Sequence, residues 1–265
     1  MGDYPLGKNE FSIILPVSSN QINSRKPGLL GAVDSILRQT YPHWELIIVD
    51  DGCRDEIPQL ADDFAEKDKR IRVIHHPENL QRVVSRNDGM KMATKDWICW
   101  LDSDDEYLKT YLEVLNSYMT EDFPGYMCYH FGATIIRMGF QSVRESYEIL
   151  EEGGGMAKFP SGHIGAGSFV FHKECLEKVG YLPEAINPYL FADMAKNESP
   201  EIIEWYGPIP TNKVPASKTL GNPWGEDWYM FYKITRKYKS KCLPIAPYIQ
   251  FVRRQKFSFQ PLRDY

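Results

Sequence analysis

Short apolar segments alternate with helical patterns along the first hundred residues of the chain, and this alternation constrains the fold most. Four runs are nearly continuous in apolar residues, as buried parallel strands are: Phe11–Val17, Glu45–Val49, Ile71–Ile74 and Trp97–Leu101. The intervening segments 29–37, 57–67 and 85–93 are typical of helices. The alternation predicts βαβ units, and therefore an α/β fold with a Rossmann-like, mostly parallel central sheet flanked by helices.

Composition excludes several other classes of protein. The chain has 265 residues, of which 43% are hydrophobic and 25% charged, which excludes bulk disorder and fibrous repeats. A net charge of −5 argues against a general nucleic-acid binder. Five scattered cysteines without CxxC spacing favour a reducing cytosol and no zinc site. Because no run approaches the length of a membrane span and Met1–Phe11 lacks the core of a signal peptide, we expect a cytoplasmic protein.

The second half of the chain has weaker patterns. A short strand is expected at 169–171, a short helix at 173–179, and a further helix after Gly225, with Trp228 and Phe231 on one face. Segment 187–222 holds five prolines and is expected to be irregular. Without a repeat or linker, we predict one domain over 1–265.

Two acidic clusters follow the second and fourth predicted strands. Asp50 and Asp51 precede Gly52, and the run Asp102–Glu106 holds four acids in five positions. Ligands of such sheets bind beyond the carboxyl ends of the strands, so both clusters are expected at one rim. Helix capping accounts for one carboxylate at each place. Four neighbouring acids repel one another unless a cation offsets their charge.

These segments resemble the GT-A glycosyltransferases of family 2. The resemblance is dense over residues 11–120, and its specific part is the run QTYPHWELIIVDDG at 39–52 followed about fifty residues later by LDSDD. It implies that 11–120 is the nucleotide-sugar-binding half of the domain and 121–265 its acceptor half. It also implies a nucleoside-diphosphate-sugar donor and a divalent cation. Mn²⁺ or Mg²⁺ suits oxygen ligands beside a diphosphate. By the resemblance, Asp102, Asp104 and Asp105, with Ser103 between them, would bind the metal and the ribose, Asp104 being the first candidate for the metal.

The resemblance also implies contacts to the nucleotide. Asp50 or Asp51 would contact the base, and Pro16 and Val17 would shape the floor of the base pocket. The alternative for either acid is a turn-forming Asp before Gly52. Arg82 matches a cation near the base or phosphate, against the alternative of a solvated surface arginine. Arg86 is interpreted as a structural ion-pair partner.

Transfer with inversion requires a base that deprotonates the acceptor hydroxyl. The resemblance assigns this role to Asp227, with Glu226 orienting Asp227 or the acceptor; the alternative is capping of the following helix. Nine basic residues against one acid lie in 231–265. Arg254 and its neighbours would close over the diphosphate, or this basic segment would contact anionic headgroups at a membrane surface.

The sequence therefore predicts a metal-dependent, inverting glycosyltransferase. It would move a sugar, most simply from a UDP-linked donor, to a hydroxyl of a glycan or lipid-linked saccharide. One alternative is a nucleotidyltransferase, but 18–21 is not the glycine-rich, basic loop that such enzymes use for a triphosphate. The other is a non-catalytic nucleotide-sugar or glycan-binding module, which would not need Asp227 and both acidic clusters.

Overall fold

A computed structural model describes residues 9–19, 26–122, 125–137, 140–144, 166–182, 226–235 and 237–252. The strands in these ranges are β1 (Phe11–Val17), β2 (Trp44–Asp50), β3 (Ile71–His75), β4 (Trp97–Trp100), β5 (Glu106–Tyr107), β6 (Cys128–Arg137), β7 (Phe140–Arg144), β8 (Phe169–His172) and β9 (Ser240–Val252). The helices are α1 (Lys26–Leu37), α2 (Ile57–Lys67), α3 (Gln81–Met92), α4 (Tyr111–Asp122), α5 (Cys175–Val179) and α9 (Glu226–Thr235), with a 3₁₀ turn η1 (Ala166–Ser168).

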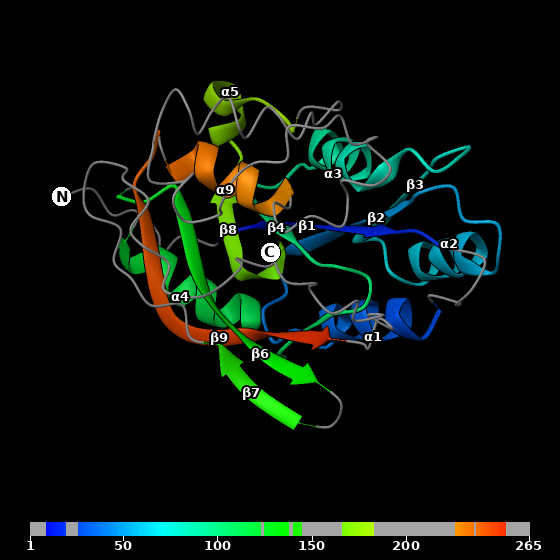
Figure 1. Cartoon of the computed structure of the whole chain (residues 1–265), viewed down its shortest axis with the longest axis horizontal. Coiled ribbons are helices and arrows are strands. Elements are labelled where there is room, and N and C mark those ends of the chain that lie inside the picture. The colour runs from blue at the N-terminus through cyan, green and yellow to red at the C-terminus, as the bar shows by residue number, and fades with distance from the viewer. Residues whose placement is uncertain are drawn as a thin grey trace, which may run out of the picture.

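The described strands form one sheet in the order β3-β2-β1-β4-β8-β6-β9-β5, with β7 paired to β6 (Figure 1). From β3 to β4 all pairings are parallel, as the βαβ pattern predicts. Beyond β4 the sheet is mixed: β8 runs antiparallel to both β4 and β6, whereas β6 and β9 are parallel. Strands from both halves of the chain therefore share the sheet, and the α/β prediction is confirmed.

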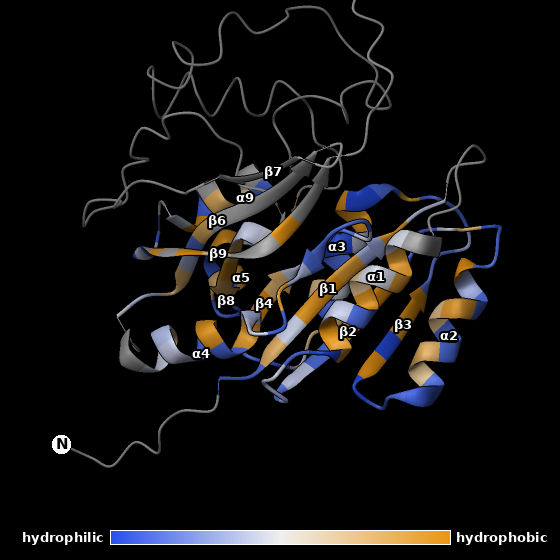
Figure 2. Cartoon of the chain, turned by 90° about the horizontal axis from the view of Figure 1, so that it is seen from below, coloured by the Kyte–Doolittle hydropathy of each residue, from blue (hydrophilic) through white to orange (hydrophobic). Residues whose placement is uncertain are grey.

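Helices cover both faces of the sheet (Figure 1). Alternate residues of β1 point to opposite faces, so that Ile13 and Leu15 join one apolar cluster and Ile14 joins the other. The first cluster takes residues from α1, α2 and α4, and the second from α3, α5 and α9. Figure 2 shows the result: β1 to β3 are largely hydrophobic, and α2 combines hydrophobic and hydrophilic residues. Because the sheet is buried on both faces, the positions of its strand ends are fixed. The site beyond these strand ends is therefore fixed as well.

The sequence predicts β1 and α2 with the observed bounds, but it does not predict β5, β6, β7, β9 or α4. In β9, Pro244 and Pro247 argue against a strand because proline cannot donate to a ladder. The register explains how they fit. Leu243 pairs with Phe131 and Tyr248 pairs with Ala133, so residues 244–247 lie in an irregularity where ladder hydrogen bonds are not required.

The buried carboxylate of Glu45 connects β1, β2 and β3 near the amino-terminal ends of these strands. Glu45 on β2 accepts hydrogen bonds from the Ser12 hydroxyl of β1 at 2.7 Å and from the Thr94 amide before β4 at 2.6 Å. Arg72 on β3 donates to its other oxygen at 3.3 Å. Burial alone would raise the pKa of Glu45, but these hydrogen bonds outweigh it and lower the pKa. Ionised Glu45 therefore stabilises the fold.

Replacement of Glu45 by Gln should reduce the free energy of unfolding by about 1–3 kcal/mol at pH 7, because buried donors lose a charged acceptor. The folded-state pKa is lowered, so this stabilisation is present above the unfolded value of about 4.3 and disappears as the pH falls through the folded value. Urea unfolding measured from pH 7 to about pH 3 should thus show that the loss of unfolding free energy in Glu45→Gln becomes smaller as the pH falls. The matched control Glu66→Gln, on the exposed side of α2, should show no such trend. A deficit independent of pH would contradict the role of the charge.

Candidate functional site

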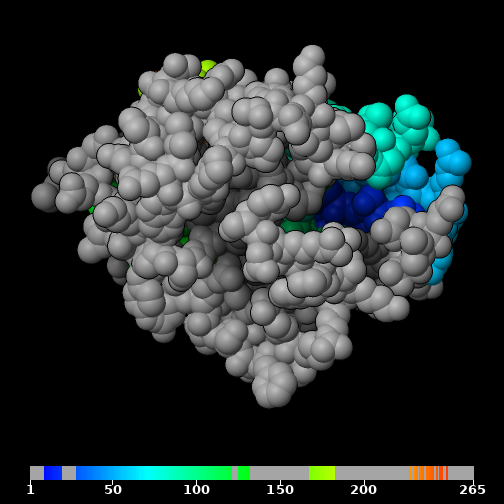
Figure 3. Space-filling model, in the orientation of Figure 1, coloured from blue at the N-terminus to red at the C-terminus, as the bar shows by residue number. Residues whose placement is uncertain are grey.

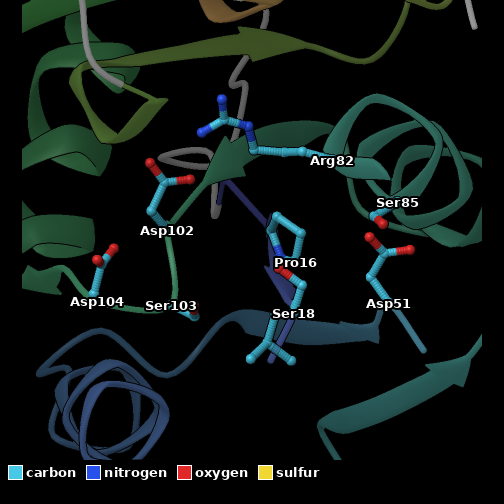
Figure 4. Close-up of a pocket in the computed structure, with 9 residues that line it drawn as sticks. Pro16, Ser18, Asp51, Arg82, Ser85, Asp102, Ser103 and Asp104 are labelled. Atoms are coloured by element: carbon cyan, nitrogen blue, oxygen red, sulfur yellow. The ribbon is translucent and has the colours of Figure 1, made fainter. Parts of the chain in front are cut away.

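A pocket of about 180 Å³ lies beyond the carboxyl ends of β1, β2 and β4, where the topology predicts a ligand site. Figure 4 shows it between the Asp102–Asp104 loop on one side and Asp51 and Ser85 on the other. The residues that line it are Pro16, Val17, Ser18, Asp51, Arg82, Ser85, Asp102, Ser103 and Asp104. The structure thus brings together most of the predicted nucleotide and metal residues.

The end of β1 contributes Pro16, Val17 and Ser18 to the pocket. In Figure 3 the dark-blue atoms from the region of β1 lie in a hollow of the molecular face. Pro16 and Val17 line the pocket, and their contact with a base remains a prediction. Ser18 was missed, and the position directly after a strand end is the signal that could have found it.

Of the two acids after β2, Asp51 lines the pocket and Asp50 does not. Asp50 is buried, and its carboxylate lies 2.8 Å from His75 Nδ1 and accepts the Cys53 amide at 2.9 Å. This second contact is the turn-forming role that the sequence left open for either acid. The Asp51 carboxylate accepts the amides of Leu80 at 2.7 Å and Gln81 at 3.1 Å, directly before and at the start of α3.

Gly52 allows this contact between Asp51 and the start of α3. Its φ is +68°, a conformation that side-chain-bearing residues rarely adopt. A Cβ at Gly52 would lie 2.2 Å from the carbonyl carbon of Glu78 and 2.5 Å from the amide nitrogen of Asn79. The β2 turn and the chain before α3 are therefore in direct backbone contact, and glycine is required there.

The second acidic cluster is held by a buried arginine. Arg86 on α3 is fully buried, and its Nη2 lies 2.8 Å from Asp102 Oδ1. Its guanidinium lies over the Trp100 ring, 4.4 Å from the centroid. The interpretation of Arg86 as a structural ion-pair partner is confirmed. The loop also packs on α1, since a Cβ on Gly28 would lie 2.6 Å from the Ser103 carbonyl oxygen.

Arg82 and Ser85 enter the pocket from the first turns of α3. Arg82 is exposed and extends over the pocket toward the side of Asp102 (Figure 4). Ser85 is buried and donates to the Gln81 carbonyl at 3.2 Å. Ser85 was not predicted, although its spacing of three residues from Arg82 places both on one helix face. Arg82 is both exposed and at the pocket, so its contact with a base or phosphate remains a prediction, beside the alternative of a solvated surface arginine.

The structure brings only some of the acids of the predicted metal site to the pocket. Asp102 and Asp104 line the pocket, whereas Asp105 is 3% exposed and does not. Within the described ranges, no group of three or more His, Cys, Asp or Glu is arranged to hold a metal ion. Two carboxylates nevertheless fit Mg²⁺ or Mn²⁺ beside a nucleotide, because such ions commonly use one or two carboxylates together with substrate phosphates and waters.

The residues that the resemblance assigns to the acceptor half lie at the start of α9 and beyond it. Glu226 and Asp227 are the first two residues of α9, whereas the sequence predicts them directly before the helix. Their chemical role remains a prediction. Arg254 lies outside the described residues. Among the helices that the structure describes, none has the length and apolar character to cross a membrane.

Known proteins share parts of this sequence and fold. TuaG of Bacillus subtilis, a putative teichuronic acid biosynthesis glycosyltransferase, is 38% identical over 89 residues, which cover 34% of this chain and 35% of TuaG. The crystal structure of Staphylococcus aureus TarS 1–349 in complex with UDP matches with a TM-score of 0.61 at 16% identity, over 92% of this chain and 60% of that one. The mannosyltransferase PcManGT from Pyrobaculum calidifontis, in complex with GDP-Man and Mn²⁺, matches with a TM-score of 0.59 at 14% identity, over 94% of this chain and 58% of that one.

The aligned part thus spans about a third of TuaG and about three fifths of the TarS fragment. At these low identities the two structural matches show a shared fold. The family model described as "Glycosyl transferase family 2" matches residues 12–180, which include all but the first residue of β1, the strands from β2 to β8, both acidic clusters and the described residues that line the pocket. The chain therefore belongs to glycosyl transferase family 2 and has the GT-A fold.

Proposed function

We propose that this chain transfers a sugar, with inversion, from a UDP-linked donor to a hydroxyl of a glycan or lipid-linked saccharide. The observation that carries the proposal is the pocket beyond β1, β2 and β4, where apolar, basic and acidic side chains meet. The UDP complex of TarS and the Mn²⁺ complex of PcManGT support the choice of donor and ion. The putative role of TuaG in teichuronic acid biosynthesis supports a saccharide acceptor and polysaccharide biosynthesis.

Each side of the pocket has a role in this proposal. Pro16 and Val17 form an apolar floor for the base, and Asp51 accepts its ring N–H. Three donors already contact the Asp51 carboxylate, which has about four lone-pair sites, so one acceptor position remains. Arg82 would contact the phosphates. Asp104, with Asp102, would hold Mn²⁺ or Mg²⁺, which when bound would offset the charge of the diphosphate.

The acceptor half supplies the base in this proposal. Asp227, with Glu226 beside it, would take the proton of the acceptor hydroxyl as that oxygen attacks the anomeric carbon. The bond between this carbon and the diphosphate oxygen breaks, and the diphosphate leaves. Arg254 would approach the leaving group. Binding of the basic C-terminal segment to anionic lipid headgroups remains part of the proposal, as a peripheral membrane contact in the cytoplasm.

Removal of the divalent cation should weaken binding of UDP, because the acidic pocket otherwise repels a diphosphate. We expect calorimetry to give a dissociation constant at least about tenfold higher in EDTA than in Mn²⁺. Asp104→Asn should lose most of this Mn²⁺ dependence and keep its circular dichroism spectrum. Asp34→Asn, an exposed acid on α1, is the matched control and should bind as the unmodified protein does. Equal affinity with and without EDTA would refute the metal role.

The pocket should prefer UDP to CDP. The Asp51 carboxylate accepts from uracil N3–H, whereas cytosine presents a lone pair at this position, and such a mismatch costs about 1–3 kcal/mol. Competition calorimetry in Mn²⁺ should therefore show UDP binding about tenfold or more tightly. Comparison of nucleotides leaves the protein unchanged, so the contacts of Asp51 with α3 are not disturbed. Equal competition by CDP would show that Asp51 does not recognise the base.

Asp227→Asn should lower turnover by about 10²–10⁴-fold, the usual contribution of a general base. Donor affinity should stay nearly constant, because the base contacts the acceptor hydroxyl rather than the diphosphate. Asp227 lies in the first turn of α9, where a purely structural role predicts a loss of about 0.3–1 kcal/mol in stability and little change in turnover. Glu177→Gln, an exposed acid on α5, controls for loss of charge in this half of the chain. Retention of most activity by Asp227→Asn would refute its role as the general base and leave it a structural residue at the start of α9.

A further inference from the structure

Two neighbouring histidines face the two neighbouring aspartates at the end of β2. Asp50 and His75 are register partners on the parallel strands β2 and β3, and Asp51 and His76 follow them. His75 lies on the side of α2, where its ring nitrogens are 2.8 Å from Asp50 and 3.1 Å from Asp62. His76 lies on the side of α3, with Nδ1 3.1 Å from Asp51 and Nε2 3.2 Å from Asp88. Each histidine thus joins one acid of the β2 end to one acid of a helix.

The His76 ring bridges two carboxylates. Its Nδ1 atom faces Asp51 and its Nε2 atom faces Asp88. An ionised carboxylate only accepts hydrogen bonds, so in the contact with Asp51 the ring N–H of His76 donates. His76 is buried and Asp51 is 4% exposed, which strengthens their hydrogen bond over its value in water. The contact of Asp50 with His75 raises the pKa of His75.

The Asp51 carboxylate also fixes the start of α3. It accepts the amides of Leu80 and Gln81, and Gln81 has a φ of +77°. A glutamine in this left-handed region costs free energy and persists only where its surroundings hold it. Arg82, the next residue, enters the pocket. The orientation of Asp51 therefore decides where the pocket side of α3 begins.

We propose that His76, which lies between Asp51 and Asp88, is a positioning residue that holds the Asp51 carboxylate on the amides of Leu80 and Gln81 and thereby holds Arg82 at the pocket. The inference deepens the proposed function and rests on it for the identity of the ligand. The acids that contact the His76 ring are Asp51 from the β2 end and Asp88 from α3, the latter 2.9 Å from Lys91.

The test compares His76→Leu, which donates no hydrogen bond, with His76→Asn, whose amide can still donate to Asp51 near the position of Nδ1. Hydrogen exchange by NMR should show the Leu80 and Gln81 amides exchanging at least about tenfold faster in His76→Leu, with recovery in His76→Asn. The Ala93 amide, which donates to Gly89 at 3.0 Å at the other end of α3, should be unaffected. Binding of UDP in Mn²⁺ should weaken about tenfold in His76→Leu and recover in His76→Asn.

His43→Leu is the matched control, because His43 directly precedes β2, at the other end of this strand from Asp50 and Asp51. It should leave both amides and the affinity within twofold of the unmodified protein. The Asp88 side chain is 29% exposed, so Asp88→Asn is a second variant. It should speed the exchange of the Leu80 and Gln81 amides to a smaller extent.

Unchanged exchange of Leu80 and Gln81 in His76→Leu and Asp88→Asn would overturn the inference. Faster exchange throughout α3, including Ala93, would also overturn it, because it would indicate general destabilisation. These measurements need no ligand. Failure of the unmodified protein to bind UDP would instead refute the proposed function, while the exchange data still decide the role of His76.

Discussion

Helix α3 is fixed by carboxylates at two places, and the geometry of the pocket depends on this. Its first amides donate to Asp51 beyond β2, and one turn further on Arg86 pairs with Asp102 beyond β4. The two acidic clusters are about fifty residues apart in the sequence. Because one rigid helix contacts both, their separation is set by the spacing of residues along α3. Arg82 and Ser85 lie between the two contacts and face the pocket.

The carboxylates of the pocket rim differ in how much of their hydrogen-bonding capacity the protein uses. Asp50 contacts His75 and the Cys53 amide, Asp51 contacts His76 and two amides, and one oxygen of Asp102 contacts Arg86. Each of these acids thus has a structural partner that offsets its charge. Both functions of an acid can coexist, since a carboxylate accepts about four hydrogen bonds. The structural interpretation of Asp51 therefore does not replace the ligand-binding one.

The parallel half of the sheet was predictable because its strands are buried on both faces. Continuous apolar runs mark such strands, and β1 and α2 have the predicted bounds. The rim was predictable because strand ends of a parallel sheet meet at one edge. Which of Asp50 and Asp51 lines the pocket was not predictable. Neighbouring residues at a strand end point to opposite faces, and only the position of α3 shows which face holds the pocket.

The sequence by itself determined the order of βαβ units, the two acidic clusters and the family to which the chain belongs. The tertiary structure decided what depends on contacts distant in sequence. Helix α3 begins at Gln81 rather than at Ser85 because the Asp51 carboxylate, distant in sequence, accepts the amides of Leu80 and Gln81 at the helix start. Strand β9 forms despite two prolines because β6 offers a ladder whose irregularity lies opposite them. Such partners are supplied by the folded chain, and no local pattern encodes them.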